Sequence, residues 1–481
     1  MTEHLDVVVV GAGLAGIGVA YHLQQRLPGR SYAILEARGA SGGTWDLFRY
    51  PGIRSDIDMY SFGYRFKPWL HDRAIADGAT ILSYLRETAA ENGIDRFIRY
   101  HHRVERVDWR SAESRWDIEA HCDDTGETVY LSAGFVWVCT GYYRYDQGYS
   151  PDFPGADSFR GPIVHPQHWP TDLDCAGKRI VIIGSGATAV TLAPALAERG
   201  ARVSVLQRSP SYVVSVPARD PLVQKLRGRA PDRVVHAVAR AKSIGLNTAL
   251  FQVSQRYPGF VKRRIKAMQR RWLPDGYDVD THFTPRYDPW DQRLCLAANG
   301  DFFRAIRRGQ LEMVTDRIAT FTEDGISLES GRNLEADVVI TATGLNLTVF
   351  GGARIAIDDT DIELPSTMGY KAMMLSGVPN LAFVVGYTNA AWTLKVDLVG
   401  EHICRLLAYM DSHGYRTVVP VRDPTVEEAP FLDFTPNYVL RSIDSLPKQG
   451  SRAPWRLRMN YLYDLVQLRY GKVADPALRF S

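Results

Sequence analysis

Two copies of one local pattern constrain this chain more than any other feature: a buried strand, a glycine turn, a helix and a second strand. The first copy, VVVVGAGLAGIGVAYHL, spans residues 7–23 and contains Gly11, Gly13 and Gly16. Such glycines permit a tight turn and let backbone N–H groups approach a pyrophosphate at the N-terminus of a helix. The flanking strand and helix supply the context that a lone motif lacks. The alternative is a glycine-rich turn in a parallel sheet without a ligand.

The acid that follows the first copy indicates which nucleotide it binds. The next apolar strand, SYAILEAR, ends in Glu36, 20 residues after Gly16. A carboxylate at this place accepts hydrogen bonds from an unphosphorylated ribose. We therefore expect FAD at the first site, with Ala15 among the residues of the binding loop.

The second copy, KRIVIIGSGATAVTLAPALAERGARVSVLQRSP at residues 178–210, ends differently. Its second strand ends in a Gln-Arg-Ser run where the first copy has an acid, and a guanidinium suits a ribose 2′-phosphate. We therefore expect NADPH here, although Arg208 could equally be a solvated surface arginine. The residues expected at this site are Gly184, Ser185, Gly186, Thr188, Ala189, Gln207, Arg208 and Ser209.

Two short apolar strands that end in Thr-Gly, at residues 135–143 and 337–345, mark where the chain would cross between the two units. The predicted fold class is α/β, with two Rossmann-like dinucleotide-binding domains and a helical insertion. The expected parts are the first part of the FAD domain (1–145), a hinge linker (146–177), the NADPH domain (178–345) with the insertion at about 212–285, and a return to the FAD domain with a C-terminal segment (346–481).

Composition excludes several other classes. A net charge of +3 does not favour a nucleic-acid partner, and no apolar run reaches the roughly 18 residues of a membrane span. The first residues lead directly into the strand DVVVVGAG, so we expect no signal peptide and a cytoplasmic protein. The five cysteines are dispersed without a CxxC pair, which argues against a metal site and against a flavin disulfide reductase.

The linker carries a specific motif. FRGPIVHPQHWP, residues 159–170, is too rich in proline for a helix interior or a central strand. Its Phe159, Gly161, His165, Trp169 and Pro170 match the FxGxxxHxxxWP fingerprint of type I Baeyer–Villiger monooxygenases. The whole chain resembles this family, and most closely the actinobacterial ethionamide-activating type. The resemblance implies that His165 holds the hinge and the NADP-bound arrangement and takes no part in proton transfer to the substrate.

This resemblance implies an NADPH- and O2-dependent FAD enzyme that converts ketones to esters or lactones through a C4a-peroxyflavin. It also makes S-oxygenation of thioethers or thioamides a natural second activity. The alternative is a flavin monooxygenase dedicated to N- or S-oxygenation. The segment RYDPWDQRLCLA, residues 286–297, resembles the one that carries the family's active-site arginine, which falls on Arg293. The alternative for Arg293 is a purely structural pair with an acid such as Asp288 or Asp291.

Further site residues follow from the same resemblance. Asp56 matches an acid that positions this arginine, although it could instead cap a helix at DIDMYSF. Trp45 could equally belong to the core. The residues implied for FAD are Thr44, Trp45, Asp46, Asp56 and Val104; for NADPH, Arg54 and Ser55; and, as weaker candidates at a helix that faces the flavin, Asn389, Trp392 and Thr393.

The insertion is strongly basic. Residues 218–273 hold 14 Lys and Arg and two Asp, a local charge of +12, which leaves −9 for the rest of the chain. One interpretation is a helical substrate lid with a solvated basic face, and another is a peripheral patch for anionic lipid. Apolar residues such as Leu246, Leu250, Phe251 and Tyr257 could instead line the substrate pocket. The sequence leaves the particular ketone and the oligomeric state open.

Overall fold

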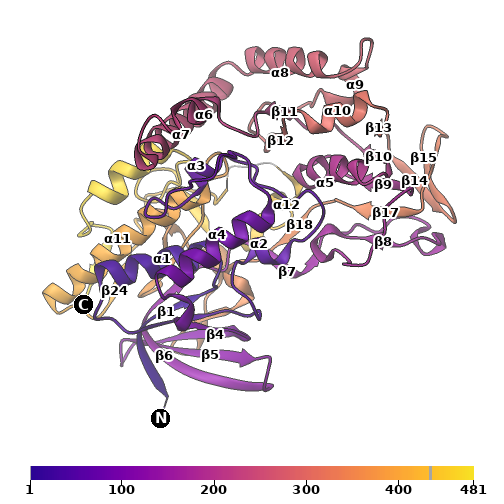
Figure 1. Cartoon of the computed structure of the whole chain (residues 1–481). Coiled ribbons are helices and arrows are strands. Elements are labelled where there is room, and N and C mark those ends of the chain that lie inside the picture. The colour runs from indigo at the N-terminus through magenta and orange to yellow at the C-terminus, as the bar shows by residue number, and fades with distance from the viewer. Residues whose placement is uncertain (1, 433–435) are drawn as a thin grey trace.

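The computed structural model describes residues 2–432 and 436–481, and the first glycine pattern belongs to a nine-stranded sheet within it (Figure 1). The strands are β1 (Glu3–Val10), β2 (Tyr32–Leu35), β3 (Ile98–Arg99), β4 (His102–Arg110), β5 (Arg115–Cys122), β6 (Glu127–Val138), β19 (Arg354–Ile357), β20 (Thr360–Asp361) and β23 (Leu381–Phe383). The parallel part runs β3-β2-β1-β6-β23, and β5 and β4 continue antiparallel from the first half of β6. The chain therefore returns to its first sheet after residue 350.

The first glycine turn is fixed by close backbone packing. Gly11 has a φ of +102°, and a Cβ there would lie 2.8 Å from the carbonyl oxygen of Cys139. A Cβ on Gly16 would lie only 1.9 Å from the carbonyl oxygen of Gly11. Helix α1 (Leu14–Arg26) consequently starts directly against the end of β1, as the glycine spacing predicts.

The second glycine pattern lies in a separate five-stranded parallel sheet, seen at the right of Figure 1. Its order is β13 (Leu311–Thr315), β10 (Arg202–Gln207), β9 (Arg179–Ile183), β17 (Val338–Thr341) and β8 (Ile163–Val164). Gly184 has a φ of +120°, and its Cβ would meet the carbonyl oxygen of Ala342 at 2.3 Å, so α5 (Ala187–Glu198) starts as α1 does. Since β8 lies within residues 146–177, the expected linker also supplies an edge strand.

The two crossings between the sheets lie side by side. β7 (Tyr143–Gly148) and β18 (Leu345–Leu347) form an antiparallel ribbon in which Leu345 pairs with Gly148 and Leu347 with Tyr143. The expected boundaries after residues 145 and 345 both fall within this ribbon. The two units are thus joined by paired strands.

The basic insertion is helical, and a parallel strand pair closes it. β11 (Val213–Val216) pairs with β12 (Cys295–Ala298). Between these strands lie α6 (Pro221–Leu226), α7 (Asp232–Arg256), α8 (Pro258–Trp272) and α9 (Val279–Phe283). Figure 1 shows α6, α7 and α8 along the upper edge of the molecule.

The remaining elements complete the first unit and the edges. The long helix α11 (Trp392–His413) packs beside α1, where His22 Nε2 lies 3.2 Å from Asp397 Oδ1. Across the described residues, no helix has the length and apolar character needed to span a bilayer. The other helices and strands are α2 (Thr44–Leu47), α3 (Met59–Phe62), α4 (Gly78–Glu91), α10 (Asp301–Arg307), α12 (Asn437–Leu440), α13 (Tyr461–Asp464), β14 (Ile318–Thr322), β15 (Gly325–Leu328), β16 (Asn333–Glu335), β21 (Gly369–Tyr370), β22 (Met374–Leu375), β24 (Val418–Pro420), β25 (Glu428–Pro430), β26 (Lys448–Gly450) and β27 (Leu478–Phe480).

Candidate active site

A cavity of about 820 Å³ lies between the first sheet and helix α5 of the second unit. Its wall includes the N-termini of both α1 and α5, at Leu14 and Ala187. Neither helix has a side-chain cap or an acid in its first turn, so the free N–H groups of both point to this region. Two uncapped helix N-termini at one cavity are the donor set that pyrophosphate groups require, and the residues present therefore fit two dinucleotides.

The first nucleotide loop and its acid lie together at this cavity. Glu36 is 6% exposed; its Oε2 accepts the N–H of Ala12 at 2.7 Å, and its Oε1 accepts that of Arg38 at 3.0 Å. Burial raises the pKa of the Glu36 carboxyl, and the two N–H donors oppose that rise. The sequence-predicted FAD residues that line the cavity are Gly11, Gly13, Ala15, Glu36, Thr44, Trp45, Asp56 and Val104.

Residues 42–57 pack against the first glycine loop at Gly43. Gly43 has a φ of +56°, and its Cβ would lie 3.1 Å from the Cα of Gly13. This contact places Thr44 and Trp45 on the cavity wall, with the Trp45 ring edge-on to Phe62. Trp45 is therefore a half-buried wall residue and not a fully buried core residue.

Asp46 and Gly16 are the two predicted FAD residues that are not on the cavity wall within the described part of the chain. Asp46 is 2% exposed, and its carboxylate accepts hydrogen bonds from Arg38 at 2.6 Å and Arg86 at 2.7 Å. Gly16 serves the packing of α1 on β1. Asp46 and Gly16 therefore stabilise the conformation of the loop and do not themselves contact the cavity.

Arg293 and Asp56 meet at the cavity. Arg293 precedes β12, and its Nε lies 2.9 Å from Asp56 Oδ2. The side chain of Arg293 retains 31% exposure, although it lies deep in the protein, because it lines the cavity. Burial by itself would lower the pKa of this guanidinium, but Asp56 holds it above the usual value. The site therefore keeps a permanent positive charge with one carboxylate beside it.

The acid that contacts Arg293 is Asp56, and the acids first considered as its structural partners have other contacts. Asp288 pairs with Lys262 at 2.6 Å, and the carboxylate of Asp291 accepts the N–H of Asp288. The cap of α3 is Asp58, whose side chain accepts the N–H of Ser61 at 2.9 Å. Asp56 is thus free of that capping role.

Three tyrosines that the sequence did not single out lie within electrostatic range of Arg293. The phenols of Tyr142 and Tyr143 lie 3.2 Å apart, and Tyr438 approaches from the C-terminal segment. Burial raises the pKa of all three phenols, so they stay protonated and can donate hydrogen bonds. Tyr142 and Tyr143 directly follow the first Thr-Gly pair, which is the signal that could have identified them. Tyr438 has no comparable local signal.

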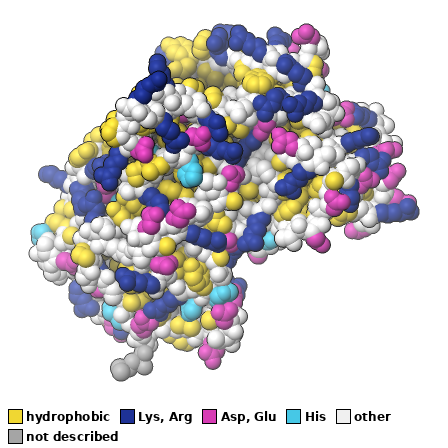
Figure 2. Space-filling model, viewed as in Figure 1, with side chains coloured by type: hydrophobic (Ala, Val, Ile, Leu, Met, Phe, Trp, Pro, Cys, Tyr) yellow, Lys and Arg dark blue, Asp and Glu magenta, His cyan; other side chains and the backbone are white. Residues whose placement is uncertain are grey.

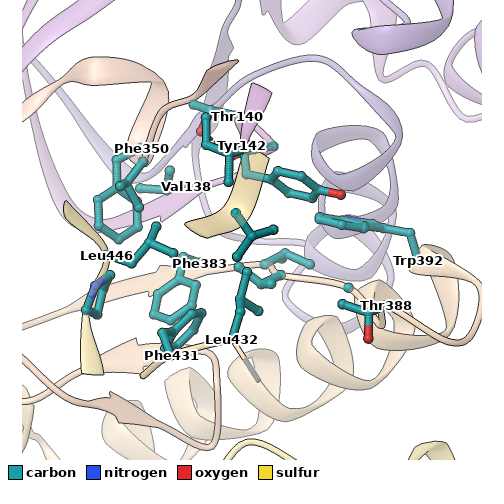
Figure 3. A pocket seen from close by; sticks show the side chains of 18 of the residues that line it. Val138, Thr140, Tyr142, Phe350, Phe383, Thr388, Trp392, Phe431, Leu432 and Leu446 are labelled. Carbon is teal, nitrogen blue, oxygen red and sulfur yellow. Dashed lines mark hydrogen bonds between the residues drawn. The ribbon is translucent and has the colours of Figure 1, made fainter. Parts of the chain in front are cut away.

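A smaller apolar cavity of about 60 Å³ adjoins the main one (Figure 3). The two cavities share seven of the described residues, among them Thr140, Tyr142 and Trp392, and the rings of Tyr142 and Trp392 stack with centroids 5.1 Å apart. Figure 3 shows aromatic and aliphatic side chains around the opposite end. They are Val138, Phe383, Phe431, Leu432 and Leu446, together with Phe350, which also lines the main cavity. This annex can hold an apolar group.

The other weak candidates on α11 differ from Trp392. Thr393 is fully buried, and its hydroxyl donates to the carbonyl oxygen of Phe62 at 2.6 Å. Asn389 donates from Nδ2 to the carbonyl oxygen of Met459 at 2.9 Å. Neither side chain lines the two cavities within the described residues, whereas Trp392 lines both.

The second nucleotide loop lies beside the same cavity, with Thr188 and Arg54 on the wall. A Cβ on Gly186 would meet no atom within 4 Å, so the backbone there is open to a ligand. The hydroxyl of Ser185 lies 3.0 Å from that of Ser211 and donates to the carbonyl oxygen of Ser209. Ala189 is buried in the core beneath the loop.

Arg208 and Gln207 point in different directions at the end of β10. Arg208 is exposed, and its side chain has no hydrogen bond or ion pair to any described residue. Gln207 is 2% exposed and donates from Nε2 to the carbonyl oxygen of His282 and to Thr315 Oγ1, both at 2.8 Å. Only Arg208 is therefore available to a ligand.

Arg54 and Ser55 also have protein partners. Arg54 forms an ion pair with Asp301 and donates to the carbonyl oxygen of Leu296 at 3.1 Å. Ser55 is 2% exposed, and its hydroxyl accepts the N–H of Ala76 at 3.1 Å. Arg54 reaches the cavity wall, while Ser55 fixes the segment that precedes Asp56.

His165 connects the two crossings. Its Nε2 lies 3.1 Å from the carbonyl oxygen of Gly344, so it donates there, and its Nδ1 accepts the N–H of Gln167 at 3.2 Å. Burial lowers the pKa of His165, which favours this neutral form. The ring also fills the space that a Cβ on Gly148 would need.

The other fingerprint residues pack against the second sheet. Phe159 is buried edge-on to Phe321, and Trp169 packs on the core of this unit, followed by Pro170. A Cβ on Gly161 would lie 2.5 Å from the carbonyl oxygen of Asp337. The motif therefore holds the crossing segment along the edge of β17.

Comparisons with known proteins agree with this arrangement. Residues 63–225 match the flavin-binding monooxygenase-like family and residues 6–66 the FAD-dependent oxidoreductase family. The chain is 57% identical to the FAD-containing monooxygenase EthA of Mycobacterium tuberculosis, over 100% of this chain and 98% of that protein. It is 44% identical to the probable FAD-binding monooxygenase AlmA of Acinetobacter baylyi, over 100% of this chain and 97% of that protein.

Two solved structures have the same fold. A steroid monooxygenase bound to NADP superimposes with a TM-score of 0.76 at 22% identity, covering 99% of both chains. The cyclohexanone monooxygenase of Rhodococcus sp. Phi1 bound to NADP+ gives 0.70 at 21% identity, covering 88% of this chain and 87% of that one.

Proposed function

Because the chain belongs to the family of FAD-containing monooxygenases that includes EthA, within the type I Baeyer–Villiger class, we propose that it converts ketones to esters or lactones and S-oxygenates thioethers or thioamides. It is an FAD- and NADPH-dependent monooxygenase with an α/β fold of two Rossmann-like units. The observation that supports the proposal is the Arg293–Asp56 pair on the wall of a cavity that the N-termini of both α1 and α5 also line.

The two loops are proposed to bind the two dinucleotides. Gly11 and Gly13 bring the N-terminus of α1 to the FAD pyrophosphate, and Glu36 accepts from the ribose. Thr44 and Trp45 would hold the flavin, and Val104 lines the same cavity. Bound FAD supplies two-electron acceptance from NADPH and the activation of O2.

The NADPH loop is proposed to work in the same way. Gly184 sets the turn, and the open backbone at Gly186 lets the N-terminus of α5 approach the pyrophosphate. Thr188 and Arg54 face the shared cavity, where the nicotinamide must reach FAD. The unpaired Arg208 binds the 2′-phosphate.

Arg293 is proposed to stabilise negative charge that develops on the oxygen being transferred and on the substrate oxygen. Its guanidinium cannot lose its proton near neutral pH, and the cavity limits competition from water. Asp56 orients Arg293 through the 2.9 Å contact. The protonated phenols of Tyr142 and Tyr438 provide donors for a substrate oxygen.

The apolar annex is proposed to hold the alkyl or aryl part of the substrate. Its walls bear few polar groups, and it begins at the Tyr142–Trp392 stack close to Arg293. A substrate with one polar oxygen or sulfur and an apolar tail would bury the tail while its polar end stays near the guanidinium.

The test compares holoenzyme and Arg293→Ala with a ketone and a thioether. Ester, sulfoxide and hydrogen peroxide are measured per NADPH oxidised. We expect Arg293→Ala to lose ester formation by about 100-fold or more while NADPH is still consumed and hydrogen peroxide is released. Arg286→Ala is the matched control, because Arg286 is exposed on the same segment and does not line either cavity described above.

Two results would contradict the proposal. Ester formation retained in Arg293→Ala would remove the assigned role of this residue. Sulfoxide without ester from any ketone in the wild type would instead identify an enzyme dedicated to heteroatom oxygenation.

A further inference from the structure

The second half of α7 has an apolar outer face that no other described element covers. Leu246, Leu250, Val253 and Tyr257 follow one another at the four- and three-residue spacing of one helix face, and they are between 38% and 62% exposed. None of them lines either cavity described above; of the residues that the sequence suggested for a substrate pocket, only Phe251 is half-buried, edge-on to Trp290. Phe260, at the start of α8, extends this face and is 51% exposed.

The outer side of α8 adds unpaired positive charge next to this apolar face. Arg256, Arg263 and Arg264 are exposed, and none forms an ion pair with an acid in residues 2–432 or 436–481. Figure 2 shows basic and hydrophobic side chains gathered along the upper edge, where Figure 1 places α7 and α8. We call Leu246, Leu250, Val253, Tyr257, Phe260, Arg263 and Arg264 the outer patch.

The fold does not need the outer patch, because other residues hold α7 in place. Arg240 donates from Nη1 to the carbonyl oxygen of Gly63 at 2.6 Å and to that of Tyr60 at 3.0 Å. Val235 and Ala239 are buried in the core of the first unit. The helix is thus anchored on its inner side, next to the segment that follows Asp56.

We propose that the outer patch docks on an anionic lipid surface. Apolar side chains beside unpaired arginines are the combination that inserts a helix face at the level of lipid headgroups. Among the described residues, eight of the 14 Lys and Arg in residues 218–273 form no ion pair with an acid, and this unpaired positive charge attracts such a surface. Two copies of the patch would repel each other, which disfavours a second copy of this chain as the occupant.

The test uses FAD-loaded holoenzyme and vesicles of phosphatidylglycerol with phosphatidylcholine, or of phosphatidylcholine alone, in a sedimentation assay. We expect binding to the anionic vesicles only. Arg263→Glu/Arg264→Glu should weaken that binding by at least about 30-fold. Leu246→Gln/Leu250→Gln/Val253→Gln should abolish the part that persists at about 0.5 M salt, where charge attraction is screened.

Matched controls change exposed residues elsewhere. Arg199→Glu/Arg354→Glu changes the net charge equally, and neither arginine has an ion-pair partner among the described residues. Tyr130→Gln/Val421→Gln/Leu462→Gln removes three other exposed apolar side chains. All variants should oxidise NADPH in solution at the wild-type rate, so a loss of vesicle binding separates from any failure of the proposed reaction.

Three results would overturn the inference. The wild type could stay in the supernatant with anionic vesicles at low salt. The patch variants could bind as well as their controls. Light scattering could show a dimer that the apolar triple variant loses, which would make a second copy the occupant.

Discussion

At the scale of single residues, neighbouring residues for which the sequence predicted the same role have different roles in the structure. Gln207 and Arg208 both stood at the expected ribose position, yet Gln207 is buried and bonded to Thr315, while Arg208 is exposed without a partner. Likewise Asp56 contacts Arg293, whereas Asp58 caps α3. Successive side chains along a strand point to opposite sides, so Gln207 and Arg208 do not face the same way. A helix has one N-cap residue, so only one of Asp56 and Asp58 caps α3.

We predict that Arg208→Gln discriminates between the two nicotinamide cofactors. Loss of a charge-assisted contact to the 2′-phosphate should raise the KM for NADPH by about 10- to 100-fold and leave the KM for NADH unchanged. Steady-state kinetics with both cofactors measures this. Arg202→Gln, at the exposed opposite end of β10, should change neither value. Equal effects on NADPH and NADH would refute the role of Arg208.

At the scale of elements, the two glycine turns use each glycine differently. Gly184 has a positive φ and packs against the backbone of Ala342, which fixes α5 on its sheet. Gly186 faces open space at the start of α5. One glycine therefore serves the fold and the other serves the approach of a ligand.

We predict that substitution by alanine affects stability at Gly184 and NADPH binding at Gly186. Gly184→Ala should lower the free energy of unfolding by about 1–3 kcal/mol or more, from left-handed strain and the clash with Ala342. Gly186→Ala should leave the urea midpoint unchanged but weaken NADPH binding. Gly331→Ala is the control for strain alone, since Gly331 has a φ of +86° and no atom near its Cβ. Normal NADPH affinity in Gly186→Ala would refute the proposed approach of the pyrophosphate.

At the scale of the whole molecule, four histidines in different parts share one electrostatic property. Burial lowers the pKa of His165 and His282, that of His236 to about 4 and that of His402 to about 3. The unfolded chain takes up protons at these groups near pH 6.5, where the native protein does not. Because the unfolded state then binds more protons, the free energy of unfolding falls as the pH drops below about 6.5.

We predict that His402→Gln flattens this acid dependence. Between about pH 6 and pH 4, wild type should lose about 1.4 kcal/mol per pH unit more than the variant, because His402 stays neutral only in the native state. A glutamine amide can still donate to the carbonyl oxygen of Leu468, which accepts from His402 Nδ1. Urea unfolding at several pH values measures the two slopes. Parallel slopes would contradict the assignment to His402.

The sequence by itself determined the features that depend on near neighbours along the chain. The spacing of Gly11, Gly13 and Gly16 predicted the strand, turn and helix, and the return to the first sheet followed from the two Thr-Gly strands. The prolines and glycine of residues 159–170 predicted where the chain crosses between the two units. These patterns are local because backbone strain and hydrogen bonding are settled within a few residues.

The tertiary structure alone decided which distant residues meet. It brought Tyr142 and Tyr438 to Arg293, turned Gln207 inward and left the outer face of α7 uncovered. For Arg293 and Asp56 the sequence offered only a family resemblance. Apolar residues occur on both faces of α7, among them the buried Val235 and the exposed Leu246, so its periodicity did not indicate which face is exposed to solvent. Long-range packing chooses among locally equivalent arrangements, because the buried area and paired charges that decide them exist only once the chain has folded.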